Sequence, residues 1–118
     1  MIDLEFSKED QDDIIKFQQT QQQIQVLFMQ KQNLQLQSAE IEGALKELEN
    51  SKEKEVFEVI GNIMVKKPKK EVFDSLKEKK ELIDLRMSTI DKQAEKLNEK
   101  AVELQKKLAS HIKHEKKK

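Results

Sequence analysis

The chain has 118 residues and a formal net charge of zero, with 23 acidic and 23 basic side chains. Only 36% of the residues are hydrophobic, and five Phe without Trp or Tyr supply too little apolar surface for a compact core of this length. We therefore expect one domain that is elongated, oligomeric or both. The balanced charge also argues against a nucleic-acid-binding protein, which usually carries a basic excess on one face.

Several classes of site lack the residues that they need. The absence of cysteine excludes disulfides, thiolate metal sites and a cysteine nucleophile. Gly43 and Gly61 are the only glycines, so no glycine-rich phosphate loop exists, and we expect neither a cofactor nor an enzyme. His111 and His114 lack a cysteine or acidic partner in a firm element, so we expect a fraying, solvated end and no metal site there.

We do not expect the N-terminal segment to be a signal peptide. Its residues MIDLEFSKED lack a basic start and an apolar run, and no later stretch approaches the ~18 apolar residues of a membrane span. We therefore expect a cytoplasmic protein with no membrane partner.

The first predicted element is a helix over residues 8–52. Apolar residues recur at two positions of a seven-residue repeat, which is the pattern of a coiled-coil seam. The d series is Leu27, Leu34, Ile41 and Leu48, and the a series is Phe17, Ile24, Lys31, Ser38 and Leu45. We interpret the charged Lys31 as a residue that fixes the register of the seam.

Residues 55–67 predict a β-hairpin. Val, Ile and Phe surround Gly61-Asn62, which suits a two-residue turn because glycine accepts positive φ and asparagine tolerates it. Pro68 should then end the second strand and enter the first turn of the next helix. We interpret the surrounding KKPKK as this strand-to-helix junction and not as a nuclear-import patch.

The predicted hairpin has two apolar faces near its turn. Ile60 should lie opposite Ile63, and Val59 opposite Met64. One isolated hairpin cannot bury both faces, so hairpins of different subunits should close into a β-barrel. Roughly eight strands, hence about four hairpins, are needed for a filled barrel. The predicted assembly residues are Val56, Phe57, Val59, Ile60, Gly61, Asn62, Ile63, Met64 and Val65.

A second helix is predicted over residues 69–112, followed by a disordered basic tail at 113–118. Its d series is Leu76, Ile83, Ile90, Leu97 and Leu104, and its a series is Phe73, Lys80, Met87, Ala94, Ala101 and Leu108. The short connection favours an antiparallel helical hairpin over dimerisation in trans. Leu36, Leu82 and Leu85 lie outside both seams, which indicates either a local heptad shift or a face toward another subunit.

Apolar residues also collect where the predicted coiled coil ends. Such a tip suits the capture of exposed hydrophobic segments of non-native proteins. The candidate residues are Ile2, Leu4, Phe6, Ile14, Ile15, Phe17, Leu104, Leu108 and Ile112. For Phe17, Leu104 and Leu108 the alternative is equally open, because they occupy seam positions and could join the helix ends.

Three segments in this order resemble the β-type subunit of archaeal prefoldin. They are the Gln-rich FQQTQQQIQVLFMQKQNL, the hairpin VFEVIGNIMVKK and the helix LKEKKELIDLRMSTIDKQAEKLNEKAVELQKKL. The hairpin is the specific part, whereas KKPKK departs from the polar capping residue common in that family.

This resemblance implies a single domain over residues 1–118 and a hexamer of two α and four β subunits. The subunits would be joined by their hairpins in β-barrels, from which coiled coils extend. Their tips would hold unfolded client proteins for a group II chaperonin without ATP. The alternative function is a structural coiled-coil adaptor or spacer that binds one specific partner.

Overall fold

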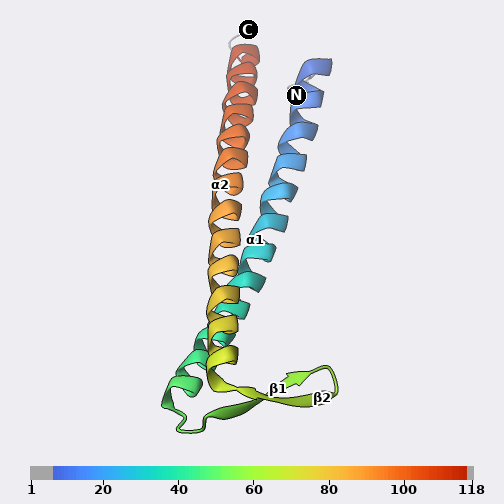
Figure 1. Ribbon diagram of the computed structural model, residues 1–118. Helices are drawn as coiled ribbons and strands as arrows, with labels where there is room; N and C mark the ends of the chain where they lie inside the picture. The colour runs from blue at the N-terminus through green and yellow to red at the C-terminus, as the bar shows by residue number, and fades with distance from the viewer. Residues whose placement is uncertain (1–6, 117–118) are drawn as a thin grey trace. The chain divides into compact units, whose positions relative to one another are not determined.

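The computed structural model describes the backbone of residues 7–116 and the side chains of residues 7–111 (Figure 1). Helix α1 spans Lys8–Asn50, strand β1 Glu55–Ile60, strand β2 Ile63–Pro68 and helix α2 Lys69–Lys116. The predicted fold class, mostly α with two long helices around a β-hairpin, is confirmed. Over residues 7–116, neither α1 nor α2 contains an apolar stretch of the length that a bilayer-spanning helix needs.

Hydrogen bonds to serine side chains explain where α1 begins and ends. The backbone N–H of Asp10 donates to Ser7 Oγ at 3.1 Å, so Ser7 is the N-cap. The helix ends at Asn50, two residues before the expected end. Ser51 Oγ accepts a hydrogen bond of 3.2 Å from the N–H of Glu53, and such a local bond competes with helix continuation.

The chain divides into two compact units, which we describe separately. The first unit contains residues up to Gln30 and from Ile90 onward. Its helix segments are antiparallel, since His111 contacts Asp10 whereas Lys107, one turn earlier in α2, contacts Asp13, later in α1. Ile90 and Ala101 are buried in this unit.

The second unit contains Lys31–Thr89, including the β-hairpin. Leu34, Ile41 and Ile83 are its buried residues, and all three belong to the predicted d series. Because they are buried within a single chain, the helices pack in cis as expected. Leu36, Leu82 and Leu85 are exposed while their seam neighbours stay buried, which argues against a local heptad shift.

The β-hairpin has the predicted register, with Ile60 opposite Ile63 and Val59 opposite Met64. Gly61 has a φ of 60°, whereas no non-glycine residue among 7–116 has positive φ. Asn62 therefore does not use the left-handed region, and the two φ signs are those of a type II′ turn.

The strand-to-helix junction differs by one residue from the expectation. Pro68 is the last residue of β2, paired with Glu55, and not part of the helix. Proline is tolerated there because it closes the strand and needs to donate no further ladder bond. The first N–H of α2, from Lys69, donates to the Lys54 carbonyl at 2.8 Å in place of a side-chain cap.

The expected tail at 113–118 is helical in part, because α2 continues through Lys116. The structure thus differs from the predicted tail in that residues 113–116 belong to α2. This segment contains only His, Glu and Lys, without the glycine or proline that ends helices.

Candidate functional site

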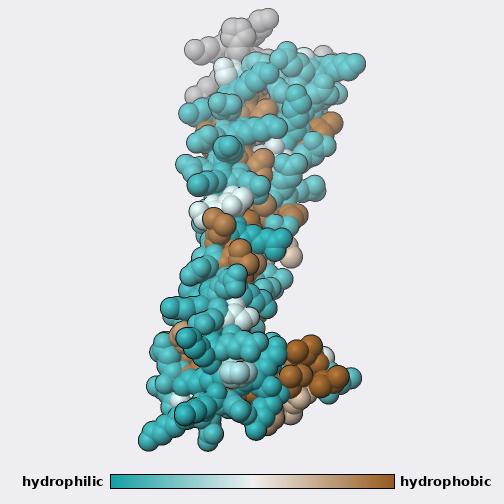
Figure 2. Space-filling view, in the orientation of Figure 1, coloured by the Kyte–Doolittle hydropathy of each residue, from teal (hydrophilic) through white to brown (hydrophobic). Residues whose placement is uncertain are grey.

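The turn end of the β-hairpin exposes apolar side chains on both faces. On one face Val59 and Met64 are 67% and 65% exposed, and on the other Ile60 and Ile63 are 52% and 66% exposed. Phe57 adds to the first face, and the hydrophobic residues form a visible patch over the hairpin in Figure 2. Side chains of this size are left in water only at a cost, so this patch is a strong candidate interface.

The helix-proximal end of the hairpin is different. Val56 and Val65 are half-buried. An open groove of about 620 Å³ lies between β1 and the adjoining helix ends, and its apolar lining includes Ala44, Leu48, Val72 and Leu76. The hairpin is thus partly packed against its own helices and free near its turn.

Ion pairs cross the polar half of the hairpin. Lys66 Nζ lies 2.9 Å from Glu55 Oε2, and Lys67 Nζ lies 2.7 Å from Glu58 Oε2. The hydrogen bond to Glu58 raises the pKa of Lys67 above its ordinary value. The charged side chains near the helices are therefore paired with one another, whereas the exposed apolar side chains are concentrated at the turn.

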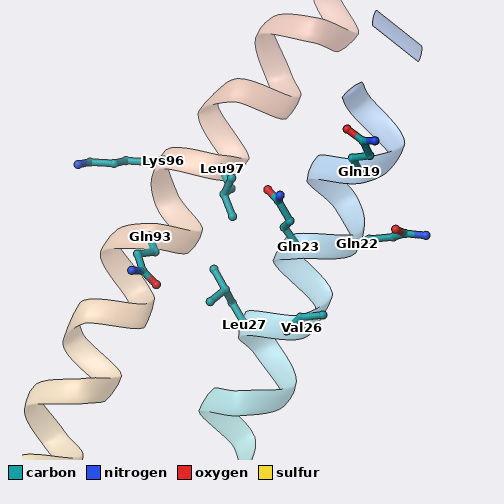
Figure 3. Close-up of a pocket in the computed structure, with 8 residues that line it drawn as sticks. All are labelled: Gln19, Gln22, Gln23, Val26, Leu27, Gln93, Lys96 and Leu97. Carbon is teal, nitrogen blue, oxygen red and sulfur yellow. The ribbon is translucent and has the colours of Figure 1, made fainter. Parts of the chain in front are cut away.

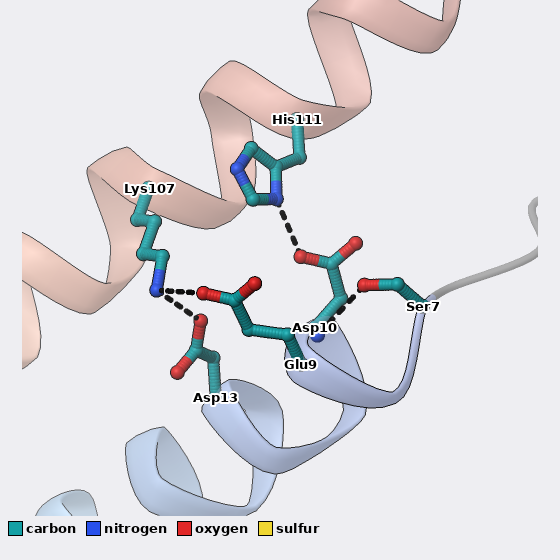
Figure 4. A network of polar contacts seen from close by, with 6 residues as sticks. All are labelled: Ser7, Glu9, Asp10, Asp13, Lys107 and His111. Atoms are coloured by element: carbon teal, nitrogen blue, oxygen red, sulfur yellow. Dashed lines mark hydrogen bonds and ion pairs between the residues drawn. The ribbon is translucent and has the colours of Figure 1, made fainter.

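A second candidate site lies where α1 begins and α2 approaches its end (Figure 4). Lys107 Nζ is 2.9 Å from Glu9 Oε1 and 3.0 Å from Asp13 Oδ2. His111 Nδ1 is 2.5 Å from Asp10 Oδ1. We call Asp10, Asp13, Lys107 and His111 the polar clasp.

The clasp carboxylates are buried, although they are charged side chains at a helix end. Asp10 and Asp13 are each 4% exposed. Hydrogen bonds, first from His111 and then from Ser7, lower the pKa of Asp10 despite its burial. Hydrogen bonds to Glu9 and Asp13 raise the pKa of Lys107 to about 12. The charged forms of both groups are thereby favoured.

Sequence reasoning missed the clasp. The signal was available, because extending the heptads backward from Leu27 places Thr20 and Asp13 in the d series and Asp10 in the a series. The d series of α2, extended forward from Leu104, reaches His111. The expectation of a solvated, unpartnered His111 was wrong, since the antiparallel packing brings it to Asp10.

Most of the predicted tip residues whose side chains are described are half-buried and not fully exposed. Ile14, Phe17, Leu104 and Leu108 are half-buried, which agrees with the seam alternative for the last three. Ile15 is 51% exposed. Ile2, Leu4 and Phe6 lie outside the described residues, as does the side chain of Ile112.

A groove also runs along the seam of the first unit (Figure 3). It encloses about 870 Å³, and Leu27, Leu97 and Gln23 point into it. The rest of its lining consists of Gln19, Gln22, Val26, Gln93 and Lys96.

Among the residues whose side chains are described, no group of three or more His, Cys, Asp or Glu could hold a metal ion.

Comparison with known proteins agrees with this combination of long helices and an exposed central hairpin. The family model described as "Prefoldin subunit" matches residues 11–115. The chain belongs to the prefoldin family. Prefoldin subunit beta of Thermococcus onnurineus is 38% identical over 93 residues, covering 78% of this chain and 80% of the relative. Prefoldin subunit beta of Archaeoglobus fulgidus is 38% identical over 96 residues, covering 80% and 83%.

A solved prefoldin structure has the same fold. The crystal structure of the prefoldin beta subunit from Thermococcus strain KS-1 matches with a TM-score of 0.83 and 32% identity, covering 91% of this chain and 95% of that one. Both the sequence and the fold of this chain therefore resemble the β subunits of prefoldin.

Proposed function

We propose that this prefoldin-family chain is the subunit of an oligomeric chaperone that captures non-native polypeptides without ATP. The observation that carries the proposal is the hairpin with exposed apolar residues on both faces, Val59 with Met64 and Ile60 with Ile63. A single chain leaves these residues uncovered, so the hairpin is the natural element of assembly.

The assembly that we propose contains two α and four β prefoldin subunits. Pairing of hairpins through their free strand edges would form β-barrels, and barrel closure would cover both apolar faces at once. The charged pairs Glu55–Lys66 and Glu58–Lys67 lie toward the helices and leave the turn half for intersubunit packing.

Clients would be held at the tip, where α1 begins and α2 ends. The candidates are Ile15, which is exposed, and the half-buried Ile14, Phe17, Leu104 and Leu108, together with Ile2, Leu4, Phe6 and Ile112. Contacts at one tip are weak, but several tips that bind the same unfolded chain raise the effective concentration and hence the avidity. Transfer to a group II chaperonin would complete the function.

The rival function is a structural adaptor or spacer that binds one specific partner. The apolar groove along Leu27 and Leu97 suits a partner helix as well as an extended client. The two functions differ in selectivity, because a chaperone binds unrelated unfolded proteins whereas an adaptor ignores them.

The deciding experiment is suppression of aggregation of an unrelated unfolded protein by the reconstituted complex without nucleotide. We expect protection by the intact complex and weaker protection after deletion of residues 1–10 together with 109–118, because the deletion removes Ile2, Leu4, Phe6 and Ile112. Size measurement must show that the truncated complex is still assembled. Undiminished protection by the truncated complex would exclude Ile2, Leu4, Phe6 and Ile112 as client-binding residues, and no protection by the intact complex would favour the adaptor.

A further inference from the structure

The seam of the first unit changes character toward the helix ends. Ala101, 2% exposed, and Ile90, 7% exposed, are buried apolar residues of the ordinary kind. Nearer the start of α1, the buried residues are Thr20, Asp13 and Asp10. Thr20 satisfies its hydroxyl locally, donating to the Lys16 carbonyl at 2.7 Å. The two carboxylates instead depend on α2.

Buried carboxylates are stable only when they are paired, and here the paired groups lie on different helices. Asp10 contacts His111, and Asp13 contacts Lys107. A buried ion pair is often no more stabilising than apolar packing of the same volume, because each charge loses its hydration. Separation of the helix ends returns these charges to water. When the start of α1 separates from the end of α2, water can replace the partners of these charged groups. The apolar residues of the adjoining seam gain no such compensation from water.

The clasp also encloses the residues that a client would need. Phe17, Leu104 and Leu108 are half-buried between the helices while the clasp is closed. Ile15 alone is exposed among the five predicted tip residues whose side chains are described. Separation of the helix ends would therefore increase the apolar surface of the tip.

We propose that the polar clasp of Asp10, Asp13, Lys107 and His111 gates the tip, so that clients gain access to Phe17, Leu104 and Leu108 when the clasp opens. The gate rests on the proposed function, since it regulates the same client site. It implies that the closed tip is a low-affinity state and the open tip a high-affinity state.

The first test measures opening without any client. Amide hydrogen exchange over residues 8–20 and 101–111 is compared between the wild-type complex and Asp10→Asn. A lost hydrogen bond to a charged group corresponds to roughly tenfold faster exchange in these segments. Asp12→Asn, an exposed carboxylate of the same turn, is the matched control and should leave exchange unchanged. Unchanged exchange in Asp10→Asn would overturn the clasp.

The second test measures whether opening matters for capture. The chain contains no cysteine, so Asp10→Cys with His111→Cys introduces the only two thiols of this subunit. A short, reducible linker between them should hold the tip closed, so that several times more complex is needed to suppress aggregation. Reduction of the linker should restore protection, as should capping both thiols without linking them.

The outcomes separate the gate from the function on which it rests. Equal protection by linked and capped complexes would overturn the gate while leaving the chaperone function intact. If the wild-type complex protects no client, the proposed function fails, and the exchange experiment still decides whether the clasp joins the helix ends.

Discussion

His111 Nδ1 lies 2.5 Å from Asp10 Oδ1, although the two residues are 101 positions apart in the chain. The Asp10 side chain is 5% exposed and that of His111 is 41% exposed, so the bond lies at the border of the seam. It joins the first turn of α1 to the last part of α2. A hydrogen bond to an ionised carboxylate is stronger than a neutral one, which suits a contact at a helix end.

This contact predicts a particular dependence of stability on acid. The pKa of Asp10 is lowered in the folded chain, chiefly by the hydrogen bond from His111, from the ordinary value of 3.8. The stabilisation by ionised Asp10 is therefore present above pH 3.8 and is lost as the pH falls through the lower folded-state pKa. The thermal midpoint of Asp10→Asn should lie below that of the wild type at neutral pH, and the gap should close in acid.

Circular dichroism melts across the acid range check this prediction. Besides His111, Ser7 at the N-cap bonds to Asp10, and Lys107 pairs nearby with Glu9 and Asp13 (Figure 4); all of these residues are retained in both proteins. Asp12→Asn serves as the control for simple loss of a charge. A gap that is the same at pH 3 and pH 7 would show that Asp10 does not stabilise as an ion.

The alkaline range tests Lys107 in the opposite direction. Hydrogen bonds to Glu9 and Asp13 raise its pKa to about 12 from 10.5. The stabilisation is fully present below pH 10.5 and is lost as the pH rises through about 12. Lys107→Gln should lower the thermal midpoint at neutral pH, and high salt should narrow the gap because the Lys107 side chain is partly exposed. Lys106→Gln, the exposed neighbour, is the control.

The hairpin prediction concerns assembly. Ile60→Asp with Ile63→Asp would place two carboxylates opposite each other in the proposed barrel, and burying unpaired charges costs several kcal/mol or more. The complex should dissociate while most helicity remains. Light scattering and circular dichroism measure both. Met29→Asp matches the exposure of Ile63, at 68% against 66%, and should leave the complex intact. An unchanged mass of the double variant would exclude the hairpin as the assembly element.

The seam prediction concerns stability. Leu34 is 8% exposed and Ile90 is 7% exposed. Replacement of either by Ala should lower the free energy of unfolding by roughly 2 to 4 kcal/mol, through lost burial and a residual cavity. Gln22→Ala and Lys92→Ala, at exposed positions, should change it little. Denaturant titration gives the comparison, and a large loss at Gln22 or Lys92 would contradict the heptad register.

The sequence alone determined the elements and most of their packing. Seven-residue spacing located the seam, and Leu34, Ile41, Ile83 and Ile90 are buried as predicted. The hairpin register followed from Gly61-Asn62, because a two-residue turn fixes which residues face each other. Such periodic and local signals are strong because each depends on residues close together in the chain.

Boundaries were predicted less well, since they depend on single hydrogen bonds. The end of α1 depends on Ser51, and the start of α2 on a bond from Lys69 to the Lys54 carbonyl. The continuation of α2 through Lys116 also exceeded the expected end. Neighbouring alternatives at such positions differ by little free energy, so composition does not select between them.

Only the tertiary structure decided the chemistry of the helix ends. In the sequence, the heptad spacing can place Asp10 and His111 at seam positions of their own helices, but it does not pair them with each other. Their pairing needs the antiparallel register of two helix segments to within one turn, which no local pattern encodes. The same packing partly buries Phe17, Leu104 and Leu108. Apolar composition thus predicted a hydrophobic tip, but the pairing of Asp10 with His111 across it follows from the register of the two helix segments.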